Sequence, residues 1–165
     1  GMRILALIAL MASPVAAQDL IFTPAHTEAC LASTQSYDGR HACVGVSAQR
    51  CMEDTAGGQT TYGMGGCLSA EFEYWDQQLN ALYGAAIDAA RAFDADMAGV
   101  AAHLATQEAN LRAMQRAWIA FRDATCDYEY SQWGGGTGGG PAIAGCMMRM
   151  TGEQALYLFS NAQGG

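Results

Sequence analysis

Six cysteines behind an amino-terminal export signal are the feature that most constrains the fold of this 165-residue chain. Arg3 supplies a positive end, an apolar run covers residues 4–12, and three small residues at 15–17 form a cleavage pattern. We expect residues 1–17 to be a signal peptide, with Gly1 as an addition from cloning. Export leads to an oxidising compartment, where an even number of cysteines predicts disulfides. All six follow the signal: Cys30, Cys43, Cys51, Cys67, Cys126 and Cys146.

The sequence after the signal predicts neither a lipid anchor nor a membrane span. Gln18, and not a cysteine, follows the cleavage pattern, so the acceptor for a lipid is missing. The apolar run at 4–12 is shorter than the roughly 20 residues of a spanning helix, and no later stretch reaches that length. We therefore expect the mature chain in the bacterial periplasm or secreted.

The spacing of the cysteines favours pairing between sequence neighbours, although the sequence leaves other pairings open. The expected bonds are Cys30–Cys43, Cys51–Cys67 and Cys126–Cys146, each of which closes a short loop. Each bond of this kind contributes about 3 kcal/mol by restricting the unfolded chain. Metal binding is the alternative role for the cysteines. The chain has no Cys-x-x-Cys pair and its three histidines are scattered, so no metal site and no cofactor is predicted.

The charge of the chain limits its partners. There are 8 basic residues, all arginine, against 16 acidic residues, which gives a net charge of −8. This field repels phosphate, so nucleic acids and anionic membrane surfaces are poor partners. A cationic partner is favoured instead.

Two long stretches carry apolar residues at spacings of three and four, which predicts two amphipathic helices. The first begins at Thr61 or Ser69, the second spans about 106–132, and residues 94–103 form the turn, with or without a helical piece. We expect an all-α fold, a small disulfide-stapled helical bundle built on this long antiparallel helical hairpin. The first stripe comprises Trp75, Leu79, Leu82, Tyr83, Ala86, Ala90 and Phe93, and the second comprises Leu111, Met114, Trp118, Phe121 and Thr125.

Three shorter helices complete the expected bundle. The first runs from Thr23-Pro24 to Cys30, because Thr is a good cap and Pro a good first helical residue. A turn at 36–39 separates it from a second helix over about 41–54. The third covers about 142–160.

A glycine-rich stretch, Gly134 to Gly140, lies before the last helix and is interrupted only by Thr137. It lacks the Lys-Ser/Thr ending of a phosphate-binding loop, so we predict an irregular connection and no nucleotide site. Pro141 is expected to keep the last helix from starting before Ala142.

Several motifs between Met64 and Cys146 resemble those of the lysozyme inhibitor LprI-like family of bacterial exported proteins. The resemblance covers roughly residues 51–160 and implies a small all-helical, disulfide-bonded domain. We divide the mature chain accordingly into an amino-terminal disulfide-bonded helical extension, 18–58, and an LprI-like helical domain, 59–165. The motifs comprise Met64, Cys67, Glu71, Asp76, Leu79-Asn80, Tyr83, the string Gln115-Arg116-Ala117-Trp118-Ile119-Ala120-Phe121-Arg122-Asp123, Cys126 and Cys146.

The polar residues of these motifs form two helix faces that an antiparallel hairpin would bring together. The Asp76/Asn80 side of the first helix would then face Arg122, whose planar guanidinium binds a carboxylate through two hydrogen bonds. We predict that this polar network fixes the register of the two helices. Its members are Asp76, Asn80, Tyr83, Gln115, Arg116, Trp118, Arg122 and Asp123.

No catalytic residues are predicted. Glu71, Glu73 and Asp76 form an acidic cluster beside Tyr74 and Trp75, but a carboxylate pair for sugar hydrolysis needs a deep cleft that a small hairpin does not offer. The expected function is that of an exported, non-enzymatic binding protein of the cell envelope, a candidate inhibitor of a cationic lysozyme.

The alternative function is a structural or protein-interaction module of the periplasm that binds another envelope protein and does not inhibit. The best loop for partner contact is the glycine-rich stretch with its tryptophan, because Trp often anchors interfaces. The candidate partner-binding residues are Glu71, Glu73, Trp133, Gly134, Gly136 and Gly138.

Overall fold

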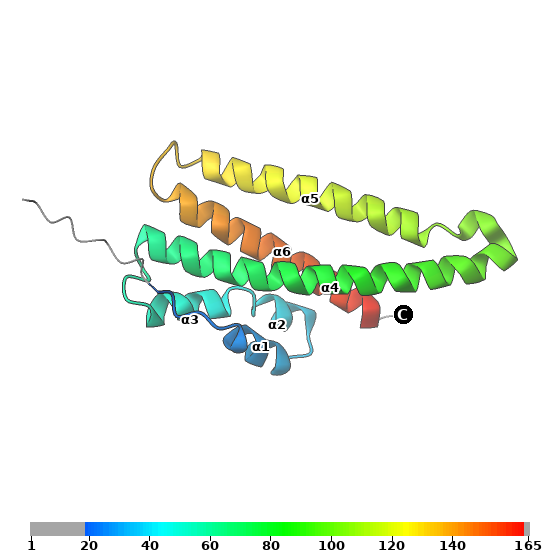
Figure 1. Cartoon of the computed structure of the whole chain (residues 1–165), viewed down its shortest axis with the longest axis horizontal. Coiled ribbons are helices and arrows are strands. Elements are labelled where there is room, and N and C mark those ends of the chain that lie inside the picture. Colours follow the sequence, from blue (N-terminus) through cyan, green and yellow to red (C-terminus); the bar gives the residue numbers. More distant parts are fainter. Residues whose placement is uncertain (1–18, 164–165) are drawn as a thin grey trace, which may run out of the picture.

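The computed structural model describes residues 19–163, and the predicted signal peptide lies outside this part of the chain. The fold is all-α, and the described residues contain no strand. Three long helices, α4 (Thr61–Ala101), α5 (Gln107–Ser131) and α6 (Gly139–Gln163), lie side by side (Figure 1). Three short helices, α1 (Ala25–Ala32), α2 (Tyr37–His41) and α3 (Val46–Asp54), pack beside α4 and α6. The predicted fold class is therefore confirmed.

The long helices form an antiparallel hairpin of α4 and α5 with α6 lying between them away from the hairpin tip (Figure 1). The main core lies where α6 packs along α4, and its buried members include Trp75, Leu79, Ala155 and Leu156. Gly152 permits this close approach, because a Cβ there would come within 3.2 Å of the Trp75 ring and closer still to Val44.

The hairpin tip is shorter than the sequence predicts. Residues 94–101 continue α4 as helix, and only η1 (Ala102–Leu104) and the residues just after it form the turn. The stretch is rich in alanine, which has the highest helix propensity, so the helix continues through Gly99. Asp94 then caps α5, because its two carboxylate oxygens each accept a hydrogen bond of 2.9 Å, from the Gln107 and Glu108 amides.

Ion pairs join the two helices just behind the tip. Glu108 accepts hydrogen bonds from Arg112 on its own helix, at 2.8 Å, and from Arg91 on α4, at 3.1 Å. These bonds, that of Arg112 first, hold the pKa of Glu108 below its usual range.

Two predictions about the short helices are wrong. Residues 41–54 are not one helix: His41 ends α2, residues 42–45 form a turn and α3 begins at Val46, because the chain turns at Gly45, whose φ of +96° favours glycine. The expected turn at 36–39 is instead the start of α2, where the Ser36 side chain accepts a hydrogen bond from the Gly39 amide and caps the helix.

The last helix begins earlier than predicted, at Gly139. Pro141 lies in its first turn, where a backbone N–H has no partner within the helix and its loss costs nothing.

The three predicted disulfides are present: Cys30–Cys43, Cys51–Cys67 and Cys126–Cys146. The first lies within the short-helix layer, the second ties α3 to α4, and the third ties α5 to α6. Two of the three disulfides thus join a long helix to another helix of the bundle.

Candidate functional site

The connection between α5 and α6 is a succession of tight turns. Gly134 and Gly135 have φ values of +54° and +83°, in the left-handed region that favours glycine. The Gly136 amide donates to the Trp133 carbonyl at 2.8 Å, and the Gly139 amide donates to the Gly136 carbonyl at 3.1 Å. The glycines of this loop therefore serve its backbone geometry.

Two aromatic rings pack directly on the backbone of this connection. The Trp133 ring covers Gly138, where a Cβ would overlap it, and the Tyr130 ring covers Gly139 in the same way. Trp133 nevertheless remains 53% exposed. The loop thus presents a tryptophan whose position is fixed on one side and open to solvent on the other.

The Cys126–Cys146 disulfide closes the base of the loop. Both sulfur atoms are buried, and Met150 packs against them with its Sδ 3.9 Å from the Cys146 Sγ. The bond holds the end of α5 against the second turn of α6. This base fixes where the loop leaves and re-enters the bundle.

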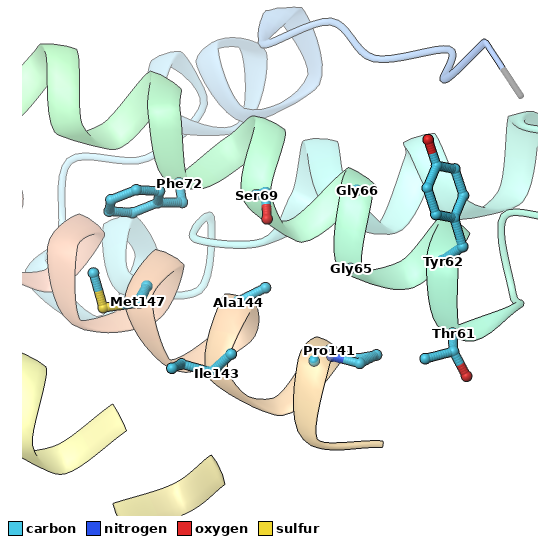
Figure 2. A pocket seen from close by; sticks show the side chains of 11 residues that line it. Thr61, Tyr62, Gly65, Gly66, Ser69, Phe72, Pro141, Ile143, Ala144 and Met147 are labelled. Atoms are coloured by element: carbon cyan, nitrogen blue, oxygen red, sulfur yellow. The ribbon is translucent and has the colours of Figure 1, made fainter. Parts of the chain in front are cut away.

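An apolar groove with a volume of about 550 Å³ lies between the first turns of α4 and α6, next to this loop (Figure 2). Gly65 and Gly140 help to keep the groove open, because neither has a side chain to fill it. A Cβ at either position would meet no atom within 4 Å. The lining residues carry no charge. They are Thr61, Tyr62, Gly65, Gly66, Ser69, Phe72, Gly140, Pro141, Ile143, Ala144 and Met147.

The groove and the loop form one continuous surface, which we call the loop end. Gly140 and Pro141 line the groove and directly follow the loop in sequence. Tyr62, Tyr130 and Trp133 are exposed aromatic residues of this end. A surface of this kind suits contact with another macromolecule, because aromatic side chains supply most interface anchors.

The loop end offers little for catalysis. Its groove is lined by no histidine, carboxylate or arginine that could transfer a proton. Within residues 19–163, no group of three or more His, Cys, Asp or Glu side chains is placed to hold a metal ion.

The prediction that Glu71 belongs to a partner-binding surface is wrong, because its side chain is fully buried. Helical periodicity sends Glu71 to the same face of α4 as Trp75 and Leu79, toward the short helices. Its neighbour Glu73 is exposed, as expected of a surface residue.

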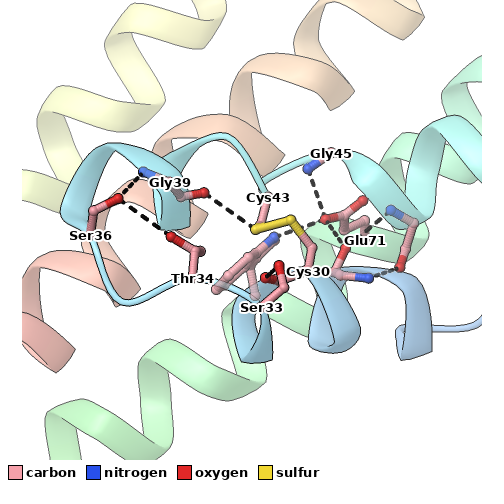
Figure 3. The surroundings of a disulfide bond; sticks show 11 residues. Cys30, Ser33, Thr34, Ser36, Gly39, Cys43, Gly45 and Glu71 are labelled. Atoms are coloured by element: carbon pink, nitrogen blue, oxygen red, sulfur yellow. Dashed lines mark hydrogen bonds between the residues drawn. A yellow bond between two sulfur atoms is a disulfide. The ribbon is translucent and has the colours of Figure 1, made fainter.

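Glu71 instead caps helix α3 from a distance (Figure 3). One carboxylate oxygen, Oε1, accepts hydrogen bonds from the Gly45 amide at 2.8 Å, the Thr27 hydroxyl at 2.9 Å and the Trp75 indole at 3.1 Å. The other, Oε2, accepts from the Ala48 amide at 2.6 Å. A negative charge is favourable at a helix N-terminus, and α3 has no capping side chain of its own.

Thr27 and Ser47 complete this arrangement. The Thr27 hydroxyl accepts from the Ser47 amide at 3.0 Å, and the Ser47 hydroxyl accepts from the Thr27 amide at 2.8 Å. All the backbone donors at the start of α3 thus find acceptors, two of them on Glu71. Sequence analysis missed this role, although the helix start at Gly45 without a polar cap is a signal for an acceptor from elsewhere.

The expected pairing of Arg122 with Asp76 does not occur, because α6 lies between the hairpin helices at this level. Arg122 donates to the hydroxyl of Thr151 on α6 at 3.4 Å and to the adjacent Asp123 at 2.9 Å. Its guanidinium lies 4.9 Å from the ring centroid of Trp118 and 6.0 Å from that of Phe72. Arg122 therefore connects α5 to α6 and contacts α4 only through an aromatic ring.

The remaining predicted network residues lie at several separate places. Asn80 donates to Asp76 at 3.3 Å on the surface of α4. Gln115, which is buried, accepts from Gln154 of α6 at 3.1 Å. Tyr83 lies beside Arg112, and Arg116 is exposed on α5. The set does not form one continuous network across the hairpin.

Comparison with known proteins supplies the family. A family model described as "Lysozyme inhibitor LprI" matches residues 51–158, which is most of the chain. The chain belongs to the LprI family. No solved structure matches the chain.

Two relatives of this chain are uncharacterised proteins. One, of Rhizobium meliloti (strain 1021), is 27% identical over 92 residues, which is 56% of this chain and 66% of the relative. The other, a 17.7 kDa protein in the puhA 5′ region of Rhodobacter capsulatus, is 27% identical over 139 residues, 84% of this chain and 85% of the relative.

The LprI match includes the whole loop end and the three long helices up to Leu158. Helices α1 and α2 and the Cys30–Cys43 disulfide lie outside it. None of the helices in residues 19–163 is both long and apolar enough to span a bilayer.

Proposed function

We propose that this LprI-family chain is an exported, non-enzymatic protein of the cell envelope that inhibits a cationic lysozyme through its loop end. The family description supports lysozyme as the partner. Three disulfides support a place outside the cytoplasm, where such bonds persist.

The observation that carries the proposal is the construction of the loop end. Trp133 is half-exposed yet fixed on Gly138, above a disulfide and beside an apolar groove. A preorganised aromatic residue loses little entropy on binding, so its contact area contributes strongly to affinity. The groove offers space for apolar side chains of the partner.

Charge supports the choice of partner. The net charge of −8 attracts a basic enzyme and raises the rate of encounter at low salt. The loop end itself is uncharged in its groove, so charge directs the approach and apolar contact stabilises the complex.

The test is lysis of cell walls by several cationic lysozymes, with the oxidised protein added in increasing amounts. We expect inhibition at near-stoichiometric ratios, and at least about a tenfold loss of potency for Trp133→Ala. Phe93→Ala is the matched control, since Phe93 is an exposed aromatic residue near the opposite end of the molecule, and it should inhibit normally. Absence of inhibition for every lysozyme would leave the non-inhibitory interaction module as the function.

A further inference from the structure

A second pocket, of about 300 Å³, lies between the short helices and the α4–α6 core. Its lining includes Trp75, which is buried, and Leu31, Tyr74 and Leu82. Three of its lining residues, Leu31, Ala32 and Arg40, come from helices outside the LprI match. The pocket therefore forms only where the short helices meet α4 and α6.

Arg40 is the one charged residue that lines this pocket. Its guanidinium carbon lies 4.5 Å from the ring centroid of Phe159, and its Nη2 donates to the Gln35 side chain at 3.0 Å. A ring face and one neutral amide use only part of the five donors of a guanidinium. Arg40 therefore keeps donors for an additional acceptor.

Among the residues that the structure describes, Arg40 and the exposed Arg116 both lack a carboxylate partner, and Arg40 is the half-buried one of the two. Across residues 19–163, no carboxylate lies within 4.0 Å of it. A carboxylate does lie within that distance of five other arginines: Arg50, Arg91, Arg112, Arg122 and Arg149. A half-buried cation fixed beside an apolar pocket and not neutralised by the protein is suited to an external anion.

The surroundings restrict that anion further. Burial is the main cause that raises the pKa of the Tyr74 phenol, and the carboxylates of Glu28 and Glu71 raise this pKa further. The phenol is therefore protonated at neutral pH and available as a donor. Repulsion from the same two carboxylates grows with the negative charge of a ligand, so among anions a singly charged one is disfavoured least.

We propose that this pocket binds a small monocarboxylate on an apolar body, with Arg40 holding the carboxylate and Leu31, Tyr74, Trp75 and Leu82 covering the apolar part. The volume is at the lower end of the roughly 300–1,000 Å³ of small-molecule sites, so it suits a short alkyl chain or one aromatic ring. The proposal does not depend on lysozyme inhibition.

Isothermal titration calorimetry of the oxidised full chain tests the site with two sources of the same chemistry. Octanoate represents a fatty acid, and N-acetylphenylalanine represents the carboxyl end of a peptide. We expect at least one of them to bind at one site per chain, at least about tenfold more tightly than octanol or N-acetylphenylalaninamide. Which one binds identifies the source, and failure of both would overturn the proposal.

Variants then locate the site. Arg40→Gln should remove the preference for the charged ligand over its neutral analogue. Arg116→Gln is the control, because it makes the same charge change at an exposed arginine of α5, and it should retain the preference. In the unchanged protein, intermolecular nuclear Overhauser effects should connect the ligand to Leu82 and Phe159. Nuclear Overhauser effects between the ligand and Tyr62 in the apolar groove would contradict the assignment. So would an undiminished preference of the folded Arg40→Gln variant for the charged ligand over its neutral analogue.

Discussion

Glu71 is a buried carboxylate that accepts four hydrogen bonds and has no cation within ion-pair distance among residues 19–163. Burial of an unpaired charge is costly unless donors replace the lost water. Two backbone amides at the start of α3, a hydroxyl and an indole supply these donors. Glu71 therefore holds the short helices against α4.

Substitution of Glu71 by Gln should lower the free energy of unfolding by about 1–3 kcal/mol. The amide group of glutamine would turn donors toward at least one of the amides of Gly45 and Ala48, which would leave a buried N–H without an acceptor. Denaturant unfolding of the oxidised protein measures the loss.

Glu73→Gln is the control for this change, because Glu73 lies on the same helix but is exposed. It should alter the unfolding free energy by less than about 0.5 kcal/mol. Equal effects of the two substitutions would mean that Glu71 is not a specific cap.

Gly138 fixes Trp133 through the absence of a Cβ. Gly138→Ala should displace the ring and increase its exposure, which acrylamide quenching of tryptophan fluorescence detects, because Trp75 is buried and Trp118 is half-buried. Gly140→Ala, at a position with open space, should leave quenching unchanged. If Gly138→Ala quenched like the unchanged protein, the packing of Trp133 on the loop would be disproved.

At the scale of elements, helix α4 stabilises two other helices with side chains of its own. Glu71 caps α3 and Asp94 caps α5, and neither capped helix has a capping side chain at its own start. Helix α4 thus stabilises the first turns of both α3 and α5.

Asp94→Asn should weaken this support at the hairpin tip. An amide retains one acceptor oxygen but loses the charge and the second acceptor, so we expect a cost of about 1 kcal/mol. Hydrogen exchange at Gln107 and Glu108 should accelerate. Asp96→Asn, two residues further along α4, should not change it, and a similar acceleration in both would rule out a specific cap.

The sequence predicted the elements well where apolar spacing was regular. The stripes of α4 and α5 and the neighbouring cysteine pairs are sufficient to give the hairpin and the three disulfides. The division at Gly45 was missed, because the Gly45 amide, at a residue with positive φ, donates to Glu71, which lies on another helix distant in sequence. The position of α6 between the hairpin helices was missed as well, and this is why Arg122 meets Thr151 and not Asp76.

At the scale of the whole molecule, the proposed activities lie at separate places. The loop end lies where α4 and α6 begin, and the hairpin tip is at the far end (Figure 1). The pocket that contains Arg40 lies beside the short helices. Sequence analysis identified Trp133 and the glycines of the loop end as candidates, because tryptophan often anchors interfaces. It did not find the groove, because its walls come from segments about 80 residues apart in sequence that meet only in the fold.

The most direct measurement of the central proposal is hydrogen exchange of the oxidised chain with and without a stoichiometric amount of a cationic lysozyme. Contact through the loop end predicts added protection at residues 130–141 and in the first turns of α4, and reduced protection as salt is raised. Protection confined to the hairpin tip at 94–106, or no change anywhere, would contradict it.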